Sequence, residues 1–235
     1  MRGDECEGML TLREVEPIGH LQPGETPVDT YFDLFSLASL TAFLALFIGR
    51  TIQLYVRDGI RVVTMIRGKP AAEKAVEVVF LLAFPLWVAD VILHAWPGGP
   101  SIDPMLFSTT WTRWVGAPLA AAGVGLFAWA LVSFGRSWRV GVDHGSPGAL
   151  VTSGVFALSR NPIFLAMDLF LVGAALMSGR WIPAAVAVVA LAGFHRQIRN
   201  EERFLENHYG DSYRAYRNRV RRYFGWVGAM RGCST

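Results

Sequence analysis

The sequence has little charge and almost no cysteine. Asp, Glu, Lys and Arg make up 17% of the 235 residues, whereas 52% are hydrophobic. The two cysteines, Cys6 and Cys233, lie at opposite ends and lack metal-ligand spacing, so neither a disulfide nor a metal site is predicted. The net charge of +3 does not require a nucleic-acid partner. The acidic N-terminal segment has no basic stretch before an apolar core, so it does not resemble a cleaved signal peptide.

The hydrophobic residues are concentrated in long runs. Three runs are each about 20 residues long with at most two charges, enough to cross roughly 30 Å of hydrocarbon: Leu34–Val56, Val76–Trp96 and Val115–Phe134. Two shorter runs, Pro162–Met177 and Trp181–Phe194, predict a tight helical hairpin that crosses the membrane twice. The sequence therefore predicts an all-α integral-membrane bundle of about five transmembrane helices. A soluble protein with several buried helices is the alternative.

Composition divides the chain into three parts. Residues 1–33 form an acidic arm, residues 34–134 hold three spans, and residues 135–235 hold a Gly-, Ser- and Pro-rich loop, the hairpin and a polar tail. In the tail, Arg196–Tyr223 has apolar and aromatic residues at three- and four-residue steps, interrupted at Gly210. This pattern predicts an amphipathic helical cap on the cytosolic side of the bundle.

The distribution of basic residues orients the predicted spans. Arg and Lys cluster in Arg57–Lys74, in Gly135–Asn161 and after Phe194, whereas the first 33 residues and the Pro97–Thr110 loop are acidic or nearly uncharged. In a five-span arrangement all three basic segments fall on one side. Because cytosolic loops carry the excess of Lys and Arg, we expect a multi-pass protein of the cell membrane with its N-terminus outside and its C-terminus in the cytosol. The basic side also favours anionic lipid headgroups.

Two further patterns within the spans concern a small-residue helix face and a pair of polar residues. Ala117, Ala121 and Gly125 recur at four-residue spacing, as on a helix face that another helix approaches closely. The stripe serves a contact within the bundle or within a dimer, so the oligomeric state stays open. Asp90 and His94 share one helix face near the outer end of the second span, where we expect a solvated pair.

The second half of the chain resembles a known family. The resemblance rests on LVTSGVF at residues 150–156, on Arg160-Asn161-Pro162-Ile163-Phe164, on Glu201-Glu202 beyond the apolar hairpin, and on Tyr209-Gly210 with Tyr213 and Tyr216. Together these resemble the isoprenylcysteine carboxyl methyltransferase family, which is related to the phospholipid N-methyltransferases. The similarity covers about residues 134–224. It implies an enzyme that uses S-adenosylmethionine from the cytosol to methylate a small or lipophilic acceptor, which enters from the bilayer.

The resemblance also implies which residues contact the cofactor. Carried over by position, they are Gly148, Ala149, Leu150, Val151, Phe156, Asn161, Pro162, Ile163, Phe164 and the glutamate pair Glu201 and Glu202. The residue types agree in part with this role. Phe156 and Phe164 offer surfaces for stacking, and Glu201 is the favoured acceptor for adenosine. The helix start at Pro162 offers backbone donors for a carboxylate.

Several positions depart from the family pattern. Asn161 stands where the family has histidine, and Phe156 and Phe164 replace tyrosines. The arginine that the family uses for the substrate carboxyl falls at Gln197, flanked by Arg196 and Arg199.

The predicted catalytic residues are Arg160, Asp168, Arg196 and Arg199. Arg160 is suited either to clamp a carboxylate or to anchor the chain at the membrane surface. An amine or hydroxyl acceptor needs a general base, for which His195 and Asp168 are the candidates.

Two other functions remain open from the sequence alone. A sterol-reductase-like membrane enzyme would bind NADPH, and the C-terminal arginines are compatible with its 2′-phosphate. A non-catalytic membrane protein that retained the fold is supported by the replaced histidine and tyrosines. The Arg-Asn-Pro loop followed by a glutamate pair favours the methyltransferase.

Overall fold

The computed structural model of the chain describes residues 27–58, 71–96, 103–107, 110–135 and 150–225, and these residues form helices and no strand. The helices are α1 (Pro27–Asp58), α2 (Ala71–Ala95), α3 (Thr110–Phe134), the short 3₁₀ turn η2 (Gly154–Ala157), α4 (Pro162–Ser178), α5 (Trp181–Tyr209) and α6 (Asp211–Arg219). The all-α prediction is confirmed. Three helices are long and apolar enough to cross a membrane, at Thr30–Arg57, Thr110–Phe134 and Trp181–Tyr209, and two apolar segments are shorter. The chain is therefore a multi-pass membrane protein.

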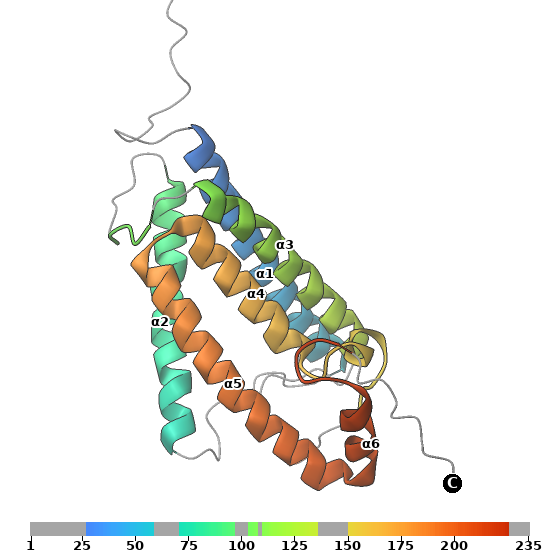
Figure 1. Ribbon diagram of the computed structural model, residues 1–235. Helices are drawn as coiled ribbons and strands as arrows, with labels where there is room; N and C mark the ends of the chain where they lie inside the picture. Colours follow the sequence, from blue (N-terminus) through green and yellow to red (C-terminus); the bar gives the residue numbers. More distant parts are fainter. Residues whose placement is uncertain (1–26, 59–70, 97–102, 108–109, 136–149, 226–235) are drawn as a thin grey trace, which may run out of the picture.

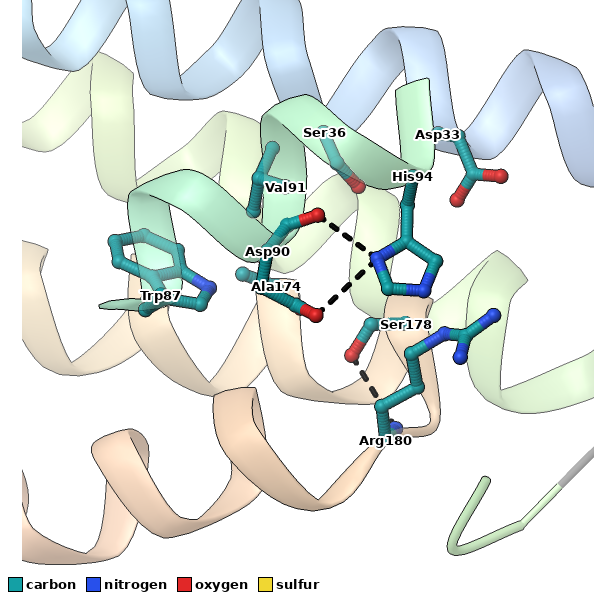
Figure 2. A pocket seen from close by; sticks show the side chains of 9 residues that line it. All are labelled: Asp33, Ser36, Trp87, Asp90, Val91, His94, Ala174, Ser178 and Arg180. Atoms are coloured by element: carbon teal, nitrogen blue, oxygen red, sulfur yellow. Dashed lines mark hydrogen bonds and ion pairs between the residues drawn. The ribbon is translucent and has the colours of Figure 1, made fainter. Parts of the chain in front are cut away.

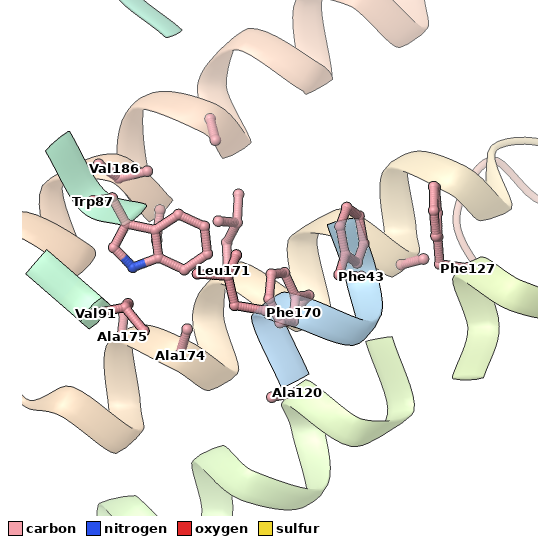
Figure 3. Close-up of a cluster of buried hydrophobic side chains, with 14 of the residues drawn as sticks. Phe43, Trp87, Val91, Ala120, Phe127, Phe170, Leu171, Ala174, Ala175 and Val186 are labelled. Carbon is pink, nitrogen blue, oxygen red and sulfur yellow. The ribbon is translucent and has the colours of Figure 1, made fainter. Parts of the chain in front are cut away.

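The long helices pack as one bundle around α4. In Figure 1, α1, α3 and α4 run side by side, α2 and α5 lie beside them, and α5 diverges from α4 toward the end where α6 turns back. The core is aromatic (Figure 3). Phe43 of α1 stacks on Phe127 of α3 with ring centroids 4.3 Å apart and on Phe170 of α4 at 4.7 Å. Trp87 of α2 meets Phe170 edge-on at 5.8 Å, so four helices share this cluster.

Glycines bring α3 and α4 into backbone contact. A Cβ atom at Gly123 would lie 2.6 Å from the Phe170 nitrogen, and one at Gly116 would lie 2.6 Å from the Gly173 oxygen. Ala121 and Gly125 are exposed, and a Cβ atom at Gly125 would meet nothing within 4 Å. The close approach expected of this span is made through Gly116 and Gly123, whereas the exposed Ala121 and Gly125 do not make it within the bundle. Small residues lie on both faces of α3, and spacing alone does not show which face meets a neighbour.

The α4–α5 hairpin forms where the sequence predicts it. Pro162 occupies the first turn of α4, where its missing N–H leaves no carbonyl unsatisfied. Gly179 ends α4 in the left-handed conformation at φ 64°, which a glycine adopts without strain. The second arm is longer than predicted, because α5 continues as one helix from Trp181 to Tyr209. The helix ends at Gly210 (φ 52°), where the sequence predicts a break, and α6 begins directly after it.

A buried pair of polar residues lies between α1, α2 and the α4–α5 turn (Figure 2). His94 Nδ1 lies 2.8 Å from the backbone oxygen of Asp90 and 3.2 Å from its Oδ1. Asp90 is only 1% exposed, so the prediction of a solvated pair is wrong. Ser36 of α1 and Arg180 of the α4–α5 turn line one pocket with these residues, which the sequence of α2 alone could not indicate. We refer to Asp90 and His94 as the Asp90 pair.

Candidate cofactor and acceptor site

The loop before α4 is fixed to the end of α3 by its first turn. Gly154 has φ 63°, and a Cβ atom there would lie 2.5 Å from Ser133 Oγ, so glycine suits both its conformation and its contact. Ser133 Oγ instead accepts a hydrogen bond of 3.2 Å from the Val155 nitrogen. Phe156 follows and is buried against Phe134 of α3, with ring centroids 4.9 Å apart. The turn thus places Phe156 inside the protein.

The Arg-Asn-Pro corner is held by its own side chains and by the C-terminal segment. Ser159 Oγ accepts a hydrogen bond from the Asn161 nitrogen at 3.1 Å, which shapes the corner before Pro162. The Arg160 nitrogen donates to the Arg221 oxygen at 3.1 Å. Asn161 Nδ2 donates to the Arg222 oxygen at 3.2 Å. Residues 220–225 are therefore bound directly to the corner.

Glu202 of α5 joins the corner to this segment. Its Oε1 accepts a hydrogen bond from Asn161 Nδ2 at 3.1 Å and lies 3.3 Å from Arg160 Nη2. Its Oε2 accepts from Arg222 Nε at 3.1 Å and from Arg222 Nη2 at 2.8 Å. The residue is 7% exposed, so this ion pairing takes place largely out of water. The hydrogen bond to Glu202 raises the pKa of the Arg222 guanidinium. We call Arg160, Asn161, Glu202 and Arg222 the Glu202 cluster.

Two tyrosines of α6 close the same region. Tyr216 donates its hydroxyl to the Phe156 oxygen at 2.7 Å, which ties α6 to the first turn of the loop. Tyr213 is 1% exposed, and its hydroxyl has no hydrogen-bond partner among the described residues. Burial and, secondarily, the charge of Glu202 raise the pKa of Tyr213 to about 12. Leu150 packs against both tyrosines and so brings a predicted cofactor residue to α6.

The structure brings most of the predicted cofactor residues together. Asn161 and Glu202 are in contact, Pro162 begins α4 beside them, and Val151, Phe156 and Ile163 share one small hydrophobic cluster. Phe164 packs farther along α4, with its ring centroid 5.5 Å from that of Phe194. Gly148 and Ala149 lie outside the described residues.

The two adjacent glutamates have different surroundings. Glu202 points into the cluster, whereas Glu201 is half-buried and accepts a hydrogen bond of 3.0 Å from Gln197 Nε2. Consecutive residues on a helix are about 100° apart, so only one of the pair can face the Asn-Pro corner. Glu201 was the favoured residue from the sequence, and the structure places Glu202 in contact with the corner instead.

The predicted catalytic residues are dispersed. Arg160 belongs to the Glu202 cluster, but Arg196 and Arg199 are exposed on α5 and make no contact with it in the described part of the chain. Asp168 lies one turn beyond Phe164 on α4, and its buried Oδ1 has no hydrogen-bond partner among the described residues.

His195 has a partner that the sequence did not indicate. Its Nδ1 lies 2.6 Å from the Tyr223 hydroxyl, and the two rings are nearly parallel with centroids 6.3 Å apart. Burial and then the negative charge of Asp168 raise the pKa of Tyr223. Tyr223 therefore contacts His195 and lies within electrostatic reach of Asp168.

Sequence reasoning missed Arg222 and Tyr223 and gave no particular role to Tyr213. Arg222 and Tyr223 follow α6 in an arginine-rich tail whose composition suggests only a membrane-facing surface. Their function as partners depends on residues 220–225 returning to the loop. The Tyr209-Gly210 break was the available signal, because it implies a change of chain direction before them.

Comparison with known proteins finds a match that covers α3, the loop, α4 and α5 and ends at the start of α6. Residues 111–212 match the family model described as phospholipid methyltransferase. The chain is also similar to a protein-S-isoprenylcysteine O-methyltransferase of Schizosaccharomyces pombe, with 29% identity over 94 residues. That match covers 39% of this chain and 40% of the yeast protein, so it spans less than half of its relative. The resemblance of this region to the isoprenylcysteine carboxyl methyltransferases and the related phospholipid methyltransferases is thereby confirmed.

Proposed function

We propose that this protein is an integral-membrane methyltransferase that uses S-adenosylmethionine to methylate a small or lipophilic acceptor. The observation that carries the proposal is the contact between Asn161 and Glu202, 41 residues apart, which joins the two most specific parts of the family resemblance. The alternative of a soluble helical protein is not supported, because three helices are long and apolar enough to cross a membrane.

The residues around the corner fit the chemical groups of the cofactor. Adenosine needs an apolar surface and an acceptor for its hydroxyl or amine groups, and Leu150, Val151, Phe156 and the glutamate pair offer both. The methionine end needs donors for its carboxylate, and the buried Arg160 offers them. The aromatic rings of this region also favour a nearby sulfonium. When bound, the cofactor supplies a methyl group on a sulfonium that leaves as a neutral thioether.

The protein's part in such a transfer is to align the reactants and exclude water. Tyr213, Tyr216 and Val220 cover the loop with buried side chains, so α6 shields this region from solvent. A carboxylate or thiolate acceptor needs no proton removal. An amine or hydroxyl acceptor does, and His195 with Tyr223 and Asp168 form the candidate base.

The arginine that the resemblance implies for the carboxyl group of the substrate is replaced by Gln197 in this chain. Its side chain carries no charge and is hydrogen bonded to Glu201, and the flanking Arg196 and Arg199 are exposed on α5. A prenylcysteine carboxylate therefore depends on Arg160 or on these flanking arginines for its counter-charge. An amine on a lipid headgroup is the second acceptor class, and it is favoured by the match to phospholipid methyltransferases and by Asp168, whose buried Oδ1 has no hydrogen-bond partner in the described part of the chain.

The proposed topology has five transmembrane helices, with the N-terminus outside and the C-terminus in the cytosol. The shorter α4 and the apolar part of α2 then cross with α1, α3 and α5. Residues 1–33 form an outer arm, 34–134 hold three spans, and 135–235 hold the cofactor loop, the hairpin and the cytosolic cap. This arrangement puts the Glu202 cluster on the cytosolic side, where the cofactor is available.

Calorimetric titration of the detergent-purified protein tests the proposal. S-adenosylhomocysteine is expected to bind, and Asn161→Ala is expected to weaken its binding by about 10-fold, since the variant loses one hydrogen bond to a charged group. Gln53→Ala, which changes an exposed side chain of α1, is the matched control. Binding of NADP instead would establish the reductase alternative, and binding of neither would favour a non-catalytic protein.

A further inference from the structure

Three arginines of α5 form one exposed face just beyond the apolar part of the helix. Arg196, Arg199 and Arg203 are spaced by three and four residues, so they lie on one side of the helix. All three side chains are exposed, and none has an acceptor among the residues that the structure describes. We call these residues the α5 arginine face. Three positive charges within about two helical turns make this surface complementary to an anionic partner.

The carboxylates of α5 are engaged elsewhere. Glu202 belongs to the Glu202 cluster, and Glu201 accepts a hydrogen bond of 3.0 Å from Gln197 Nε2. Glu206 lies within ion-pair distance of two arginines of α6, with contacts of 2.6 and 3.8 Å. The α5 arginine face is therefore uncompensated within the described part of the chain, whereas these two arginines of α6 have a partner.

The same side of α5 is apolar and exposed before it reaches the arginines. Trp181, Val188 and Ala192 lie seven and four residues apart, and Arg196 follows after four more, so the four residues share one side of the helix. The three apolar residues are exposed. Because α5 is long and apolar enough to cross a membrane, this exposed surface contacts acyl chains. A surface for an acyl chain thus continues directly into the α5 arginine face.

The length of α5 places the arginines at the level of the lipid headgroups. At 1.5 Å per residue, Arg196 lies about 22 Å and Arg203 about 33 Å beyond Trp181, and the hydrocarbon core is about 30 Å thick. Exposed tryptophans are typical of a membrane boundary, and Trp181 lies at the same end of the bundle as Trp96 and Trp111 (Figure 1). Arginine side chains are long enough to extend from just inside the other boundary to the headgroups.

We propose that the α5 arginine face binds the headgroup of an anionic phospholipid, with an acyl chain along the exposed apolar residues that precede it. Guanidinium groups donate paired hydrogen bonds to phosphate oxygens, and the net negative charge of the lipid offsets that of the arginines. In the proposed topology this lipid belongs to the cytosolic leaflet, which carries the anionic lipids. The bound lipid holds the turn of α5 that carries Glu202 at the level of the headgroups.

Lipid titration followed by native mass spectrometry of the full-length protein in detergent tests the proposal. Apparent dissociation constants are measured for dioleoylphosphatidylglycerol and dioleoylphosphatidylcholine, which share their acyl chains and differ in net charge. Each arginine near an anionic surface strengthens binding by about five-fold, so wild type is expected to prefer the anionic lipid by about 10-fold or more. Replacing Arg196, Arg199 and Arg203 together by glutamine is expected to lower this preference by at least about five-fold.

A second triple variant is the matched control. Arg57, Arg219 and Arg221 are also exposed, but they belong to α1, α6 and the C-terminal segment. Their replacement by glutamine removes the same net charge and is expected to change the lipid preference by less than about two-fold. Because all six side chains are exposed, both variants are expected to unfold at the wild-type temperature in detergent, which thermal unfolding checks.

Three results would overturn the lipid site. One is an unchanged preference in the α5 variant, and another is an equal loss in the two triple variants, which would indicate attraction by net charge alone. The third is weaker binding of N-acetyl-S-farnesylcysteine to the α5 variant with an unchanged lipid preference, which would assign the arginines to an acceptor carboxylate. The lipid titration requires no S-adenosylmethionine, so its outcome is independent of whether the proposed function is correct.

Discussion

The Asp90 pair and the Glu202 cluster are both buried and polar, but they are built in different ways. Asp90 and His94 are one turn apart on α2 and can meet as soon as that helix forms. The Glu202 cluster joins the loop, α5 and the C-terminal segment across separations of 20 to 61 residues. The first pair has one acid and one base, whereas the second has two arginines for one glutamate.

This difference separates a structural role from a binding role. The Asp90 pair joins one acid and one base within α2, and the loss of Asp90 removes this contact. The Glu202 cluster holds surplus positive charge and unused donors, which a protein maintains only when a ligand completes the arrangement or when other contacts compensate. Changes at the Glu202 cluster should therefore alter ligand binding, and changes at the Asp90 pair should alter stability.

The largest effect is expected from Glu202→Ala. The change leaves the largely buried Arg160 side chain without a carboxylate, and removing one partner of a buried pair costs about 3–5 kcal/mol. Arg222 loses the same partner but is more exposed, so its share is smaller. S-adenosylhomocysteine binding is expected to weaken by about 100-fold or more, measured by calorimetry in detergent.

Two further variants keep this result interpretable. Glu202→Gln retains an acceptor for Asn161 and is expected to fold if the alanine variant does not. Glu206→Ala removes a partly exposed partner of Arg217, a kind of pair that contributes about 0–1 kcal/mol, and serves as the control. Wild-type affinity in a folded Glu202→Gln protein would contradict a binding role for the cluster.

A smaller and purely structural effect is expected from Asp90→Ala. His94 Nδ1 keeps the backbone oxygen of residue 90 but loses the carboxylate, so we expect the free energy of unfolding to fall by about 1–3 kcal/mol. Thermal unfolding in detergent measures this loss, and the affinity for S-adenosylhomocysteine is expected to stay within about two-fold. A selective loss of affinity with unchanged stability would reverse the contrast between the two regions.

The smallest effect concerns alkaline pH and the tyrosines near the Glu202 cluster. Burial raises the pKa of Tyr213 from 10.0 to about 12, so between these values the unfolded chain releases a proton that the folded protein retains. The contribution of the buried, protonated Tyr213 to the free energy of unfolding is complete below pH 10 and is lost as the pH rises toward 12. Thermal unfolding at pH 8, 10 and 11 is expected to show a shallower decline for Tyr213→Phe than for wild type. Parallel pH profiles for the two proteins would contradict this expectation.

Features encoded by neighbouring residues could be predicted from the sequence. The apolar runs predicted the helical class and, from the gap between the two short runs, the end of α4, and Gly210 predicted the break after α5. The family pattern also predicted that the Asn-Pro corner and the glutamate pair belong to one site. These signals depend on local conformation or on a motif, and both can be recognised in the sequence alone.

Features that depend on helix rotation could not be predicted. The choice between Glu201 and Glu202 depends on one residue of rotation about a helix axis, and the choice between Gly123 and Gly125 depends on two. The burial of Asp90 depends on a turn some 90 residues away in the chain. The contact of Arg222 with Glu202 requires the C-terminal segment to return to the loop, and no periodicity in α6 predicts that return.

The glycine contacts between α3 and α4 bear on the rate at which a ligand exchanges. With backbone atoms touching at Gly116 and Gly123, these helices cannot slide or rotate past each other without steric clash. The end of α3 at Phe134 and the start of α4 at Pro162 therefore stay at a constant separation. Residues 220–225 are attached to the corner through two backbone hydrogen bonds and the side chain of Asn161. If the proposed cofactor binds at this corner, we expect its entry and release to require detachment of this short C-terminal segment rather than spreading of the helices.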